Sequence, residues 1–275
     1  MNYQQYRPSG FRLLPPVVKN LLIINGLVFL ATWVLVSNVG FNLTQHFGLY
    51  HWGSDYFKPY QYITHLFMHG GFWHLFSNMF ALWMFGNALE NIWGGKKFLI
   101  YYLITGLGAA FIHTLYTSYQ IISIEQAAAI YTNAPSVEAF AAFTSEFVPG
   151  IYKGSFYQLI DSWNDGNSNY YAKNSISLIN QLIELKKDIP TVGASGAVFG
   201  VLLAYGMLFP NQLIYLNFFF PIKAKYFVAL YGCFELFAGI QNSEGDNIAH
   251  FAHLGGMLFG FILIKYWNKN SRKFY

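Results

Sequence analysis

A serine and a histidine stand in strongly apolar surroundings, where polar side chains are costly. Ser195 lies in Gly193-Ala194-Ser195-Gly196 at the start of one apolar segment, and His253 lies in the last apolar segment. Lipid solvates a hydroxyl or an imidazole poorly, so such groups in membrane-spanning segments are functional candidates. If the two side chains meet in the fold, the serine is a nucleophile and the histidine its base. The pair predicts a protease that cuts other proteins within the membrane.

The depth of the two residues supports their meeting. Ser195 lies about 15 residues before Pro210, or roughly 22 Å along a helix, and His253 lies about 12 residues before Lys265, or roughly 18 Å. In a hydrocarbon core about 30 Å thick, both side chains fall on the order of 10 Å below the outer surface. The sequence therefore predicts one level for both.

The two segments also carry faces suited to close contact. Small residues recur at every fourth position of each segment: Gly196, Gly200 and Ala204 in one, Ala252, Gly256 and Gly260 in the other. Such faces let membrane helices approach backbone to backbone. An isolated Gly-Ala-Ser-Gly is more often a packing motif, but a histidine on the matching seam favours the catalytic interpretation.

Three further side chains complete the predicted site. His74 and Asn78 are four residues apart, on one face of a helix, and both can donate hydrogen bonds to an oxyanion. The alternative is that they only join neighbouring helices. Phe199, one turn after Ser195, is placed to stack on the imidazole of His253, with ordinary packing as the alternative.

The sequence offers no obvious acidic partner for His253. Glu235 lies within the fifth apolar segment, Glu90 at the end of the second, and Asp246 near the water interface. We therefore expect a two-residue dyad of Ser195 and His253. Because the base must be neutral, activity should fall as the pH drops through the pKa of the histidine.

Composition agrees with a membrane protein. The 275 residues are 55% hydrophobic, 20% aromatic and only 10% charged, whereas soluble domains carry about 25% charged residues. The net charge of +4 is scattered, which argues against nucleic-acid binding. The single cysteine, Cys233, excludes an internal disulfide.

Apolar segments of spanning length define the predicted fold. The class is all-α, a six-transmembrane-helix bundle with spans at about 18–37, 73–93, 97–117, 194–209, 218–240 and 247–267. The fourth segment is too short to cross fully. We expect the aromatic-rich loop 38–72 to lie in the headgroup layer. Residues 118–192 form a predicted extracytoplasmic insertion within a single domain 1–275, and the apolar spacing in 174–188 predicts a helix there.

Basic residues predict the orientation. Eleven of the sixteen lysines and arginines fall on one side if six helices alternate. The positive-inside rule then places both termini in the cytoplasm. The members of this set are Arg7, Arg12, Lys19, Lys96, Lys97, Lys223, Lys225, Lys265, Lys269, Arg272 and Lys273.

The chain resembles the rhomboid intramembrane serine proteases. The resemblance rests on several stretches in the family's order: Phe57 to His69, His69-Gly-Gly-Phe-Trp-His74-Leu-Phe-Ser-Asn78 with Gly86 and Glu90, Gly193-Ala-Ser195-Gly196, and Ala249-His250-Phe-Ala-His253-Leu-Gly-Gly256 with Gly260. Each stretch alone is weak, and the combination is specific.

The resemblance implies a site with defined roles. Ser195 would be the nucleophile and His253 the base, with His74, Asn78 and the backbone N–H of Ser195 as the oxyanion hole. It also implies a water-filled cavity, and because water must reach Ser195 to hydrolyse the acyl-enzyme, we expect Ser77, His69 and His250 to line it. Phe199, Gly193, Gly256 and Gly260 are the supporting residues. The fifth helix and the loop Asn242–Asn247 would gate entry.

The resemblance also implies partners and location. Substrates would be single-pass membrane proteins in the lipid bilayer, and no cofactor, metal or nucleic acid is expected. We expect a multi-pass protein of a bacterial plasma membrane, with cytoplasmic termini and an active site that opens to the extracytoplasmic side.

Two departures from the family pattern stand out. Many relatives carry tyrosine where Phe199 stands, and their connection between helices three and four is short, whereas about 75 residues intervene here. The insertion either covers the cavity and selects substrates or is an appended domain without a catalytic role.

Two rival functions remain open at this stage. One is a pseudoprotease, although such relatives typically lack the serine or the histidine. The other is a metal protein or transporter built on His69, His74, His250 and His253. Against it, the chain lacks the His-Glu-x-x-His motif that a membrane metalloprotease needs.

Overall fold

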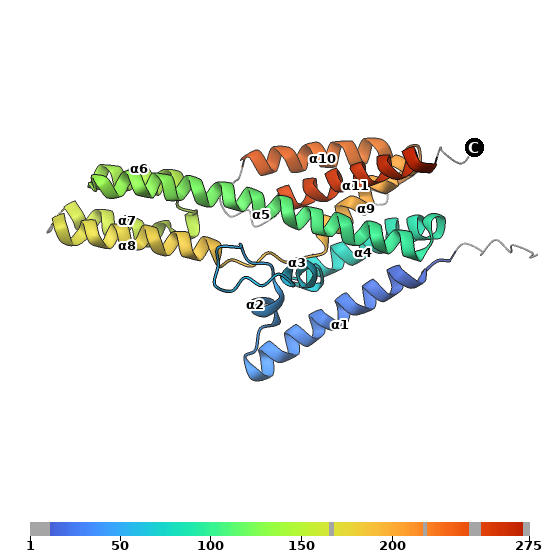
Figure 1. The fold of residues 1–275 in the computed structure, drawn as a ribbon, viewed down its shortest axis with the longest axis horizontal. Coiled ribbons are helices and arrows are strands. Elements are labelled where there is room, and N and C mark those ends of the chain that lie inside the picture. The colour runs from blue at the N-terminus through green and yellow to red at the C-terminus, as the bar shows by residue number, and fades with distance from the viewer. Residues whose placement is uncertain (1–11, 165–167, 217–218, 242–248, 272–275) are drawn as a thin grey trace, which may run out of the picture.

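The computed structural model describes residues 12–164, 168–216, 219–241 and 249–271. Helices dominate these residues (Figure 1). In chain order they are α1 (Pro16–Val39), α2 (Leu43–Phe47), α3 (Gln61–Thr64), the 3-10 turn η1 (His65–Phe67), α4 (Phe72–Trp93), α5 (Gly95–Asn133), α6 (Val137–Phe147), α7 (Gly150–Asn164), α8 (Ser168–Lys187), α9 (Ser195–Leu208), α10 (Ala224–Gln241) and α11 (His250–Ser271). A short hairpin of β1 (Leu213–Leu216) and β2 (Phe220–Lys223) precedes α10.

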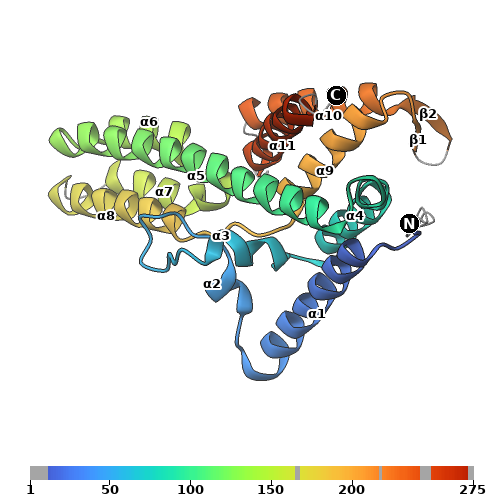
Figure 2. The same ribbon diagram turned by 45° about the vertical axis from the view of Figure 1, so that its right-hand side comes forward.

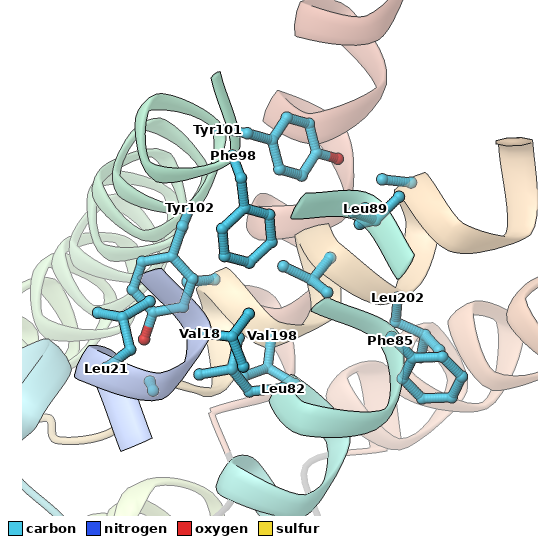
Figure 3. Close-up of a cluster of buried hydrophobic side chains, with 14 of the residues drawn as sticks. Val18, Leu21, Leu82, Phe85, Leu89, Phe98, Tyr101, Tyr102, Val198 and Leu202 are labelled. Atoms are coloured by element: carbon cyan, nitrogen blue, oxygen red, sulfur yellow. The ribbon is translucent and has the colours of Figure 1, made fainter. Parts of the chain in front are cut away.

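Helix α9 lies at the centre of the part that holds the predicted spans. It packs against α4, α5, α10 and α11, while α1 packs on α4. The side chains between these helices form one apolar core, in which Leu82 and Phe85 of α4, Phe98 and Tyr102 of α5, and residues of α9 and α1 meet (Figure 3). We call α1, α4, α9, α10, α11 and residues 95–117 of α5 the helical body.

Four of the six predicted spans coincide closely with α1, α4, α9 and α11, and two need correction. The third, expected to end at residue 117, continues without a break to Asn133. The fifth does not begin at residue 218, because 220–223 is a strand that pairs antiparallel with β1. The residue before a proline avoids the helical conformation, which keeps Phe220 out of a helix, and α10 begins directly after the strand, at Ala224.

Only some of these helices satisfy a strict test of length and hydropathy for a membrane span. Among the described residues, α1 and α5 pass, and α9 is apolar but shorter, with 14 residues. The shortness of α9 agrees with the prediction that the fourth segment cannot cross fully. The count of six spans stays a prediction.

The length of α5 shows that it extends beyond any membrane it crosses. A helix of 39 residues measures about 58 Å, whereas the hydrocarbon core is about 30 Å thick. The apolar first half packs in the helical body, and the second half leaves it (Figure 1).

Residues 118–192, here called the insertion, have an apolar core of their own. The second half of α5 packs with α6, α7 and α8 around buried side chains that include Phe140, Phe156, Trp163 and Ile179. Helix α8 spans Ser168–Lys187 and includes most of the predicted helix 174–188. This cluster is separate from the core of the helical body, so the insertion is a folded unit and not a loop.

The segment 38–72 joins the insertion to the helical body. Leu49 and Thr191 exchange two backbone hydrogen bonds of 2.9 and 2.8 Å. The hydroxyl of Ser54 donates to Asp188 Oδ1 (2.6 Å), and His51 Nε2 lies 2.8 Å from Ser118 Oγ. The end of the insertion is therefore held in place immediately before Ser195.

The basic turns lie at one end of the molecule. The start of α1, the α4–α5 turn and the end of α11 lie at the right in Figure 1, and the α6–α7 end of the insertion lies at the left. Figure 2 shows the β1–β2 hairpin at the same end as the start of α1. Lys19, Lys96 and Lys223 belong to that end, while Arg7, Arg272 and Lys273 lie outside the described residues.

Candidate active site

Ser195 is the first residue of α9, and a glycine turns the chain into it. Gly193 has φ 122°, which residues other than glycine rarely adopt. Its N–H donates to the carbonyl oxygen of His65 (3.0 Å). The first turn of a helix has N–H groups without intrahelical partners, so the chain presents both the hydroxyl and free backbone donors at this point.

Glycines bring α9 and α11 into direct contact beside Ser195 and His253. A Cβ atom built on Gly256 would lie 1.9 Å from the carbonyl oxygen of Gly196. One built on Gly196 would lie 2.3 Å from Ala109 Cβ and 3.4 Å from the carbonyl oxygen of Ala252. Only glycine fits at either position, and the predicted small-residue seam is present.

The imidazole of His253 is fixed on two sides. Its ring stacks on Phe199 of α9, with centroids 4.0 Å apart and planes 7° from parallel. Its Nδ1 lies 2.8 Å from Oε2 of Glu235 on α10. The ring is 8% exposed, so both contacts are made in a largely buried position.

The contact with Glu235 corrects the prediction that His253 has no acidic partner. Glu235 is 3% exposed, and the spacing along the chain could not show which face of α10 meets α11. A signal was nevertheless present, because a carboxylate in an apolar segment is expensive unless it has a partner. The structure thus places a carboxylate against the Nδ1 side of the His253 ring.

His74 lies next to Ser195 at the start of α4. A Cβ atom on Gly193 would lie 2.8 Å from His74 Nε2 and 3.7 Å from Ser195 Oγ, so both atoms border the same point. The backbone N–H of Gly70 makes a long hydrogen bond to His74 Nδ1 (3.4 Å). With Nδ1 as the acceptor, Nε2 carries the proton and is a donor toward the site.

Asn78 lies one turn further along α4 and is 5% exposed. Its Nδ2 donates to the carbonyl oxygen of His74 (2.9 Å). An amide nitrogen has two hydrogens, so one donor remains for a ligand.

Two more predicted site histidines border this group. His69 is 5% exposed, lies edge-on to His74 with ring centroids 5.1 Å apart, and has no hydrogen-bond partner among the described residues for either ring nitrogen. Burial lowers the pKa of His69 to about 4, as it does that of His65 in η1. Both rings are therefore neutral at pH 7.

His250 shares the carboxylate with His253, since its Nδ1 lies 2.6 Å from the same Oε2 of Glu235. Gly260, the last predicted supporting residue, leaves room on α11 for the hydroxyl of Tyr101, which donates to the carbonyl oxygen of Gly200 (2.8 Å). The predicted gate Asn242–Asn247, together with Asp246, lies outside the described residues.

Glu235, His250 and His253 are residue types that can bind a metal ion. Its ligand atoms lie within 4.8 Å of one another. Tetrahedral zinc with bonds of about 2.0–2.1 Å keeps its ligand atoms roughly 3.3 Å apart. The observed distances of 2.6 and 2.8 Å are those of hydrogen bonds, so the side chains are arranged as donors and acceptor. Among the described residues, the ligand group contains His250 and His253 of the rival four-histidine cluster, and not His69 or His74.

Comparison with known proteins identifies the family. A model of the rhomboid domain matches residues 56–269. The chain belongs to the rhomboid family. The match includes α4, α9, α10 and α11, and therefore every element that carries a predicted site residue.

Curated relatives carry the same family name. "Rhomboid-like protein 11, chloroplastic" of Arabidopsis thaliana is 31% identical over 108 residues, which cover 36% of this chain and 38% of the relative. "Rhomboid protein 1, mitochondrial" of Saccharomyces cerevisiae is 26% identical over 207 residues, which cover 75% and 41%. An uncharacterized mitochondrial rhomboid protein of Schizosaccharomyces pombe is 25% identical over 285 residues, which cover 96% and 69%.

These relatives also bear on location. The chain spans about two fifths of the length of the first two. The family and the apolar helices make this rhomboid a membrane protein. The names of the relatives place them in chloroplasts and mitochondria, which counts against the expected bacterial plasma membrane, and we do not retain that compartment.

Proposed function

We propose that this rhomboid is an intramembrane serine endopeptidase. The observation that carries the proposal is the position of His253, held between Phe199 and Glu235 against the helix whose first residue is Ser195. A serine is a weak nucleophile unless a base accepts its proton, and a third group that orients the base is the usual arrangement.

The reaction follows from these positions. Ser195 Oγ attacks the carbonyl carbon of the scissile peptide, and its proton passes to His253 Nε2. The C–N bond then breaks, and the proton moves from His253 to the departing amine. Water repeats the sequence on the acyl-enzyme, so that the second product leaves with a new carboxylate and Ser195 is restored.

The oxyanion hole belongs to the same proposal. The carbonyl oxygen becomes negative in the tetrahedral intermediate, and preorganised donors there lower the barrier by about 2.7–4 kcal/mol each. The oxyanion hole has three donors: Nε2–H of His74, the remaining N–H of Asn78 and the backbone N–H of Ser195. His74 Nε2 and Ser195 Oγ border one point beside Gly193, which supports the assignment.

Substrates and orientation are proposed on chemical grounds. A site of hydroxyl and imidazoles inside an apolar bundle suits the peptide bonds of single-pass membrane proteins that lie in the same bilayer. We propose six spans, with the basic end in the cytoplasm and the insertion on the opposite side.

Covalent labelling of the serine tests the proposed chemistry. A fluorophosphonate probe should label the wild-type protein in detergent micelles or liposomes, and Ser195→Ala should remove the label. Ser145→Ala is the matched control, because Ser145 is an exposed serine of α6 in the insertion. His253→Ala should reduce cleavage of a transmembrane substrate by more than about 10³-fold. Equal labelling of wild type and Ser195→Ala, or activity that a chelator removes, would contradict the protease.

The insertion needs a test of its own. We propose that the insertion covers the active site or selects substrates, because its end is hydrogen-bonded to segment 38–72 just before Gly193. Lys187 Nζ lies 3.1 Å from Glu125 Oε1, so residues 126–186 can be replaced by a short glycine linker with little strain. A changed choice among transmembrane substrates, with Ser195 still labelled, is expected. Unchanged rate and choice would make the insertion an appended unit.

A further inference from the structure

A buried carboxylate stands on an otherwise apolar helix. Glu235 is 3% exposed, whereas its neighbours Phe234, Leu236 and Phe237 are 58%, 47% and 65% exposed. Burying a charge is costly unless it is paired and hydrogen-bonded. The residue therefore requires partners, and its partners indicate its role.

The partners of Glu235 are two imidazole nitrogens. Oε2 lies 2.6 Å from Nδ1 of His250 and 2.8 Å from Nδ1 of His253. A carboxylate only accepts hydrogen bonds, so each Nδ1 carries a hydrogen. In a neutral imidazole the opposite nitrogen, Nε2, then holds the lone pair. His253 is thus set in the tautomer that can accept a proton from a serine.

We propose that Glu235 is a positioning residue for the reaction, which holds His253 with Nδ1 protonated and Nε2 free as the base. The inference rests on the proposed function. The carboxylate also lies where the positive charge of the imidazolium appears when His253 accepts the proton of Ser195, and it stabilises that charge without taking the proton itself.

The position of α10 decides whether this contact exists. Glu235 comes from α10, while Ser195 and His253 come from α9 and α11. A Cβ atom on Gly239, one turn after Glu235, would lie 3.1 Å from His250 Cβ and 3.1 Å from Phe251, so glycine lets α10 approach α11 at this level. Displacement of α10 from α11 separates the carboxylate from His253, and the base is complete only when the two helices are in contact.

Other ionisable groups face His253 and enter the interpretation of any pH profile. Glu235 lies on α10, and His250 lies on α11 with His253 itself. His74 on α4 and His113 on α5 interact electrostatically with His253. From α9 the ring meets Phe199, which carries no charge. Glu235 is thus the acid that contacts the base.

The substitution Glu235→Gln tests the role while keeping the size of the side chain. We expect kcat for a transmembrane substrate to fall about 10²–10⁴-fold with KM nearly unchanged. We also expect the acid limb of the pH–rate profile to move, because the imidazolium loses its counter-charge. A merely structural carboxylate would not move that limb.

Glu90→Gln is the matched control. Glu90 is also 3% exposed and accepts hydrogen bonds from the backbone N–H groups of Val17 (2.9 Å) and Val18 (2.8 Å), at the opposite end of α4 from His74. This variant should lower the thermal unfolding temperature and leave the acid limb of the pH profile where it is in wild type.

A second measurement covers the case in which Glu235→Gln does not fold. Nitrogen-15 chemical shifts of labelled histidines in the wild-type protein, assigned with a His253→Gln sample, report which nitrogen of His253 carries the proton. A protonated Nδ1 supports the proposal, and a protonated Nε2 overturns it. Wild-type kcat and pH profile in a folded Glu235→Gln protein would also overturn it, while labelling of Ser195 would leave the protease itself intact.

Discussion

The helical body and the insertion differ in what they expose and in the charged groups they bury. Both have an apolar core, but the body also exposes many large apolar residues and buries ionisable side chains. Its exposed members include Leu27, Trp33, Trp73, Leu230 and Phe237, and its buried polar members include Asn25, Asn78, Glu90, Glu235 and His253. The insertion buries Phe140, Trp163 and Ile179 and exposes Asp161, Lys173 and Glu184.

The difference shows that one chain is built for two solvents. In the body, contact with lipid leaves no hydrophobic force to join helices, so glycine seams and buried hydrogen bonds join them. In the insertion, water drives aromatic side chains inward. Helix α5 belongs to both, which explains why its apolar pattern ends near residue 117 while its backbone remains helical to Asn133.

The largest effect should come from the core of the insertion. Phe140 is fully buried, and Phe140→Ala should cost about 3–5 kcal/mol of the free energy of unfolding of the insertion. Limited proteolysis should then cut within 118–192 while α9 and α11 stay protected. Tyr157→Ala, at a side chain 46% exposed, is the control and should change stability by less than about 0.5 kcal/mol. Simultaneous proteolysis of both regions in Phe140→Ala would remove the distinction between them.

Acid should weaken the segment that joins the two regions. Burial lowers the pKa of His65 from 6.5 to about 4, so the folded protein binds fewer protons than the unfolded chain between these values. The contribution of His65 to the free energy of unfolding is therefore complete above pH 6.5. It falls by about 3 kcal/mol as the pH is lowered from 6.5 to about 4. Thermal unfolding between pH 7.5 and 4.5 measures the loss.

The substitution His65→Gln serves as the control for that pH dependence. The variant should show a shallower dependence of the unfolding temperature, since only His69 then contributes a comparable shift in this segment. An equally steep dependence in the variant would show that burial of His65 is not the cause.

The next largest effect should come from a substitution at the glycine contact between α9 and α11. Gly256→Ala places a methyl group against the carbonyl oxygen of Gly196, and we expect a loss of about 1–3 kcal/mol together with weaker fluorophosphonate labelling of Ser195. Gly26→Ala is the matched control, because a Cβ atom there meets nothing within 4 Å; it should be neutral or stabilising by up to about 1 kcal/mol. Equal losses in the two variants would mean that helix propensity, and not close packing, governs the body.

The smallest effect should come from the exposed ion pairs of the insertion. Lys187 Nζ lies 3.1 Å from Glu125 Oε1 and 3.0 Å from Glu184 Oε1, and both carboxylates are substantially exposed. Lys187→Met should therefore cost no more than about 1 kcal/mol, and less at high salt. Differential scanning calorimetry at 0.05 and 0.5 M NaCl measures this, and a large salt-independent loss would show that the aliphatic stem, not the charge, stabilises the insertion.

Much of the fold could be predicted because membrane helices leave long apolar segments in the sequence. The ends of α1, α4, α9 and α11 lie within a few residues of the predicted spans. The third and fifth boundaries were wrong because hydropathy reports the solvent around a segment and not its backbone conformation. Helix α5 changes solvent without ending, and the apolar residues before α10 form a strand.

The candidate site divides in a similar way. The predicted stacking of Phe199 on His253 is observed, because the rise per residue of a helix is fixed and puts the two side chains at one level. The meeting of Ser195 with His253 stays a prediction. The prediction that no acidic residue contacts His253 was wrong, because the rotation of α10 about its own axis is set by packing, which hydropathy does not encode. The catalytic roles themselves stay predictions.

The uninterrupted course of α5 has a mechanical consequence. At one level α5 contacts the glycine-rich faces of α9 and α11, where Gly108 lies against Phe259 and Ala109 against Gly196. At another level it forms part of the core of the insertion. A continuous helix bends little, so a displacement of the insertion would also tilt the part of α5 that contacts the glycines. A partner that binds residues 118–192 would thereby change the spacing of the helices around Ser195.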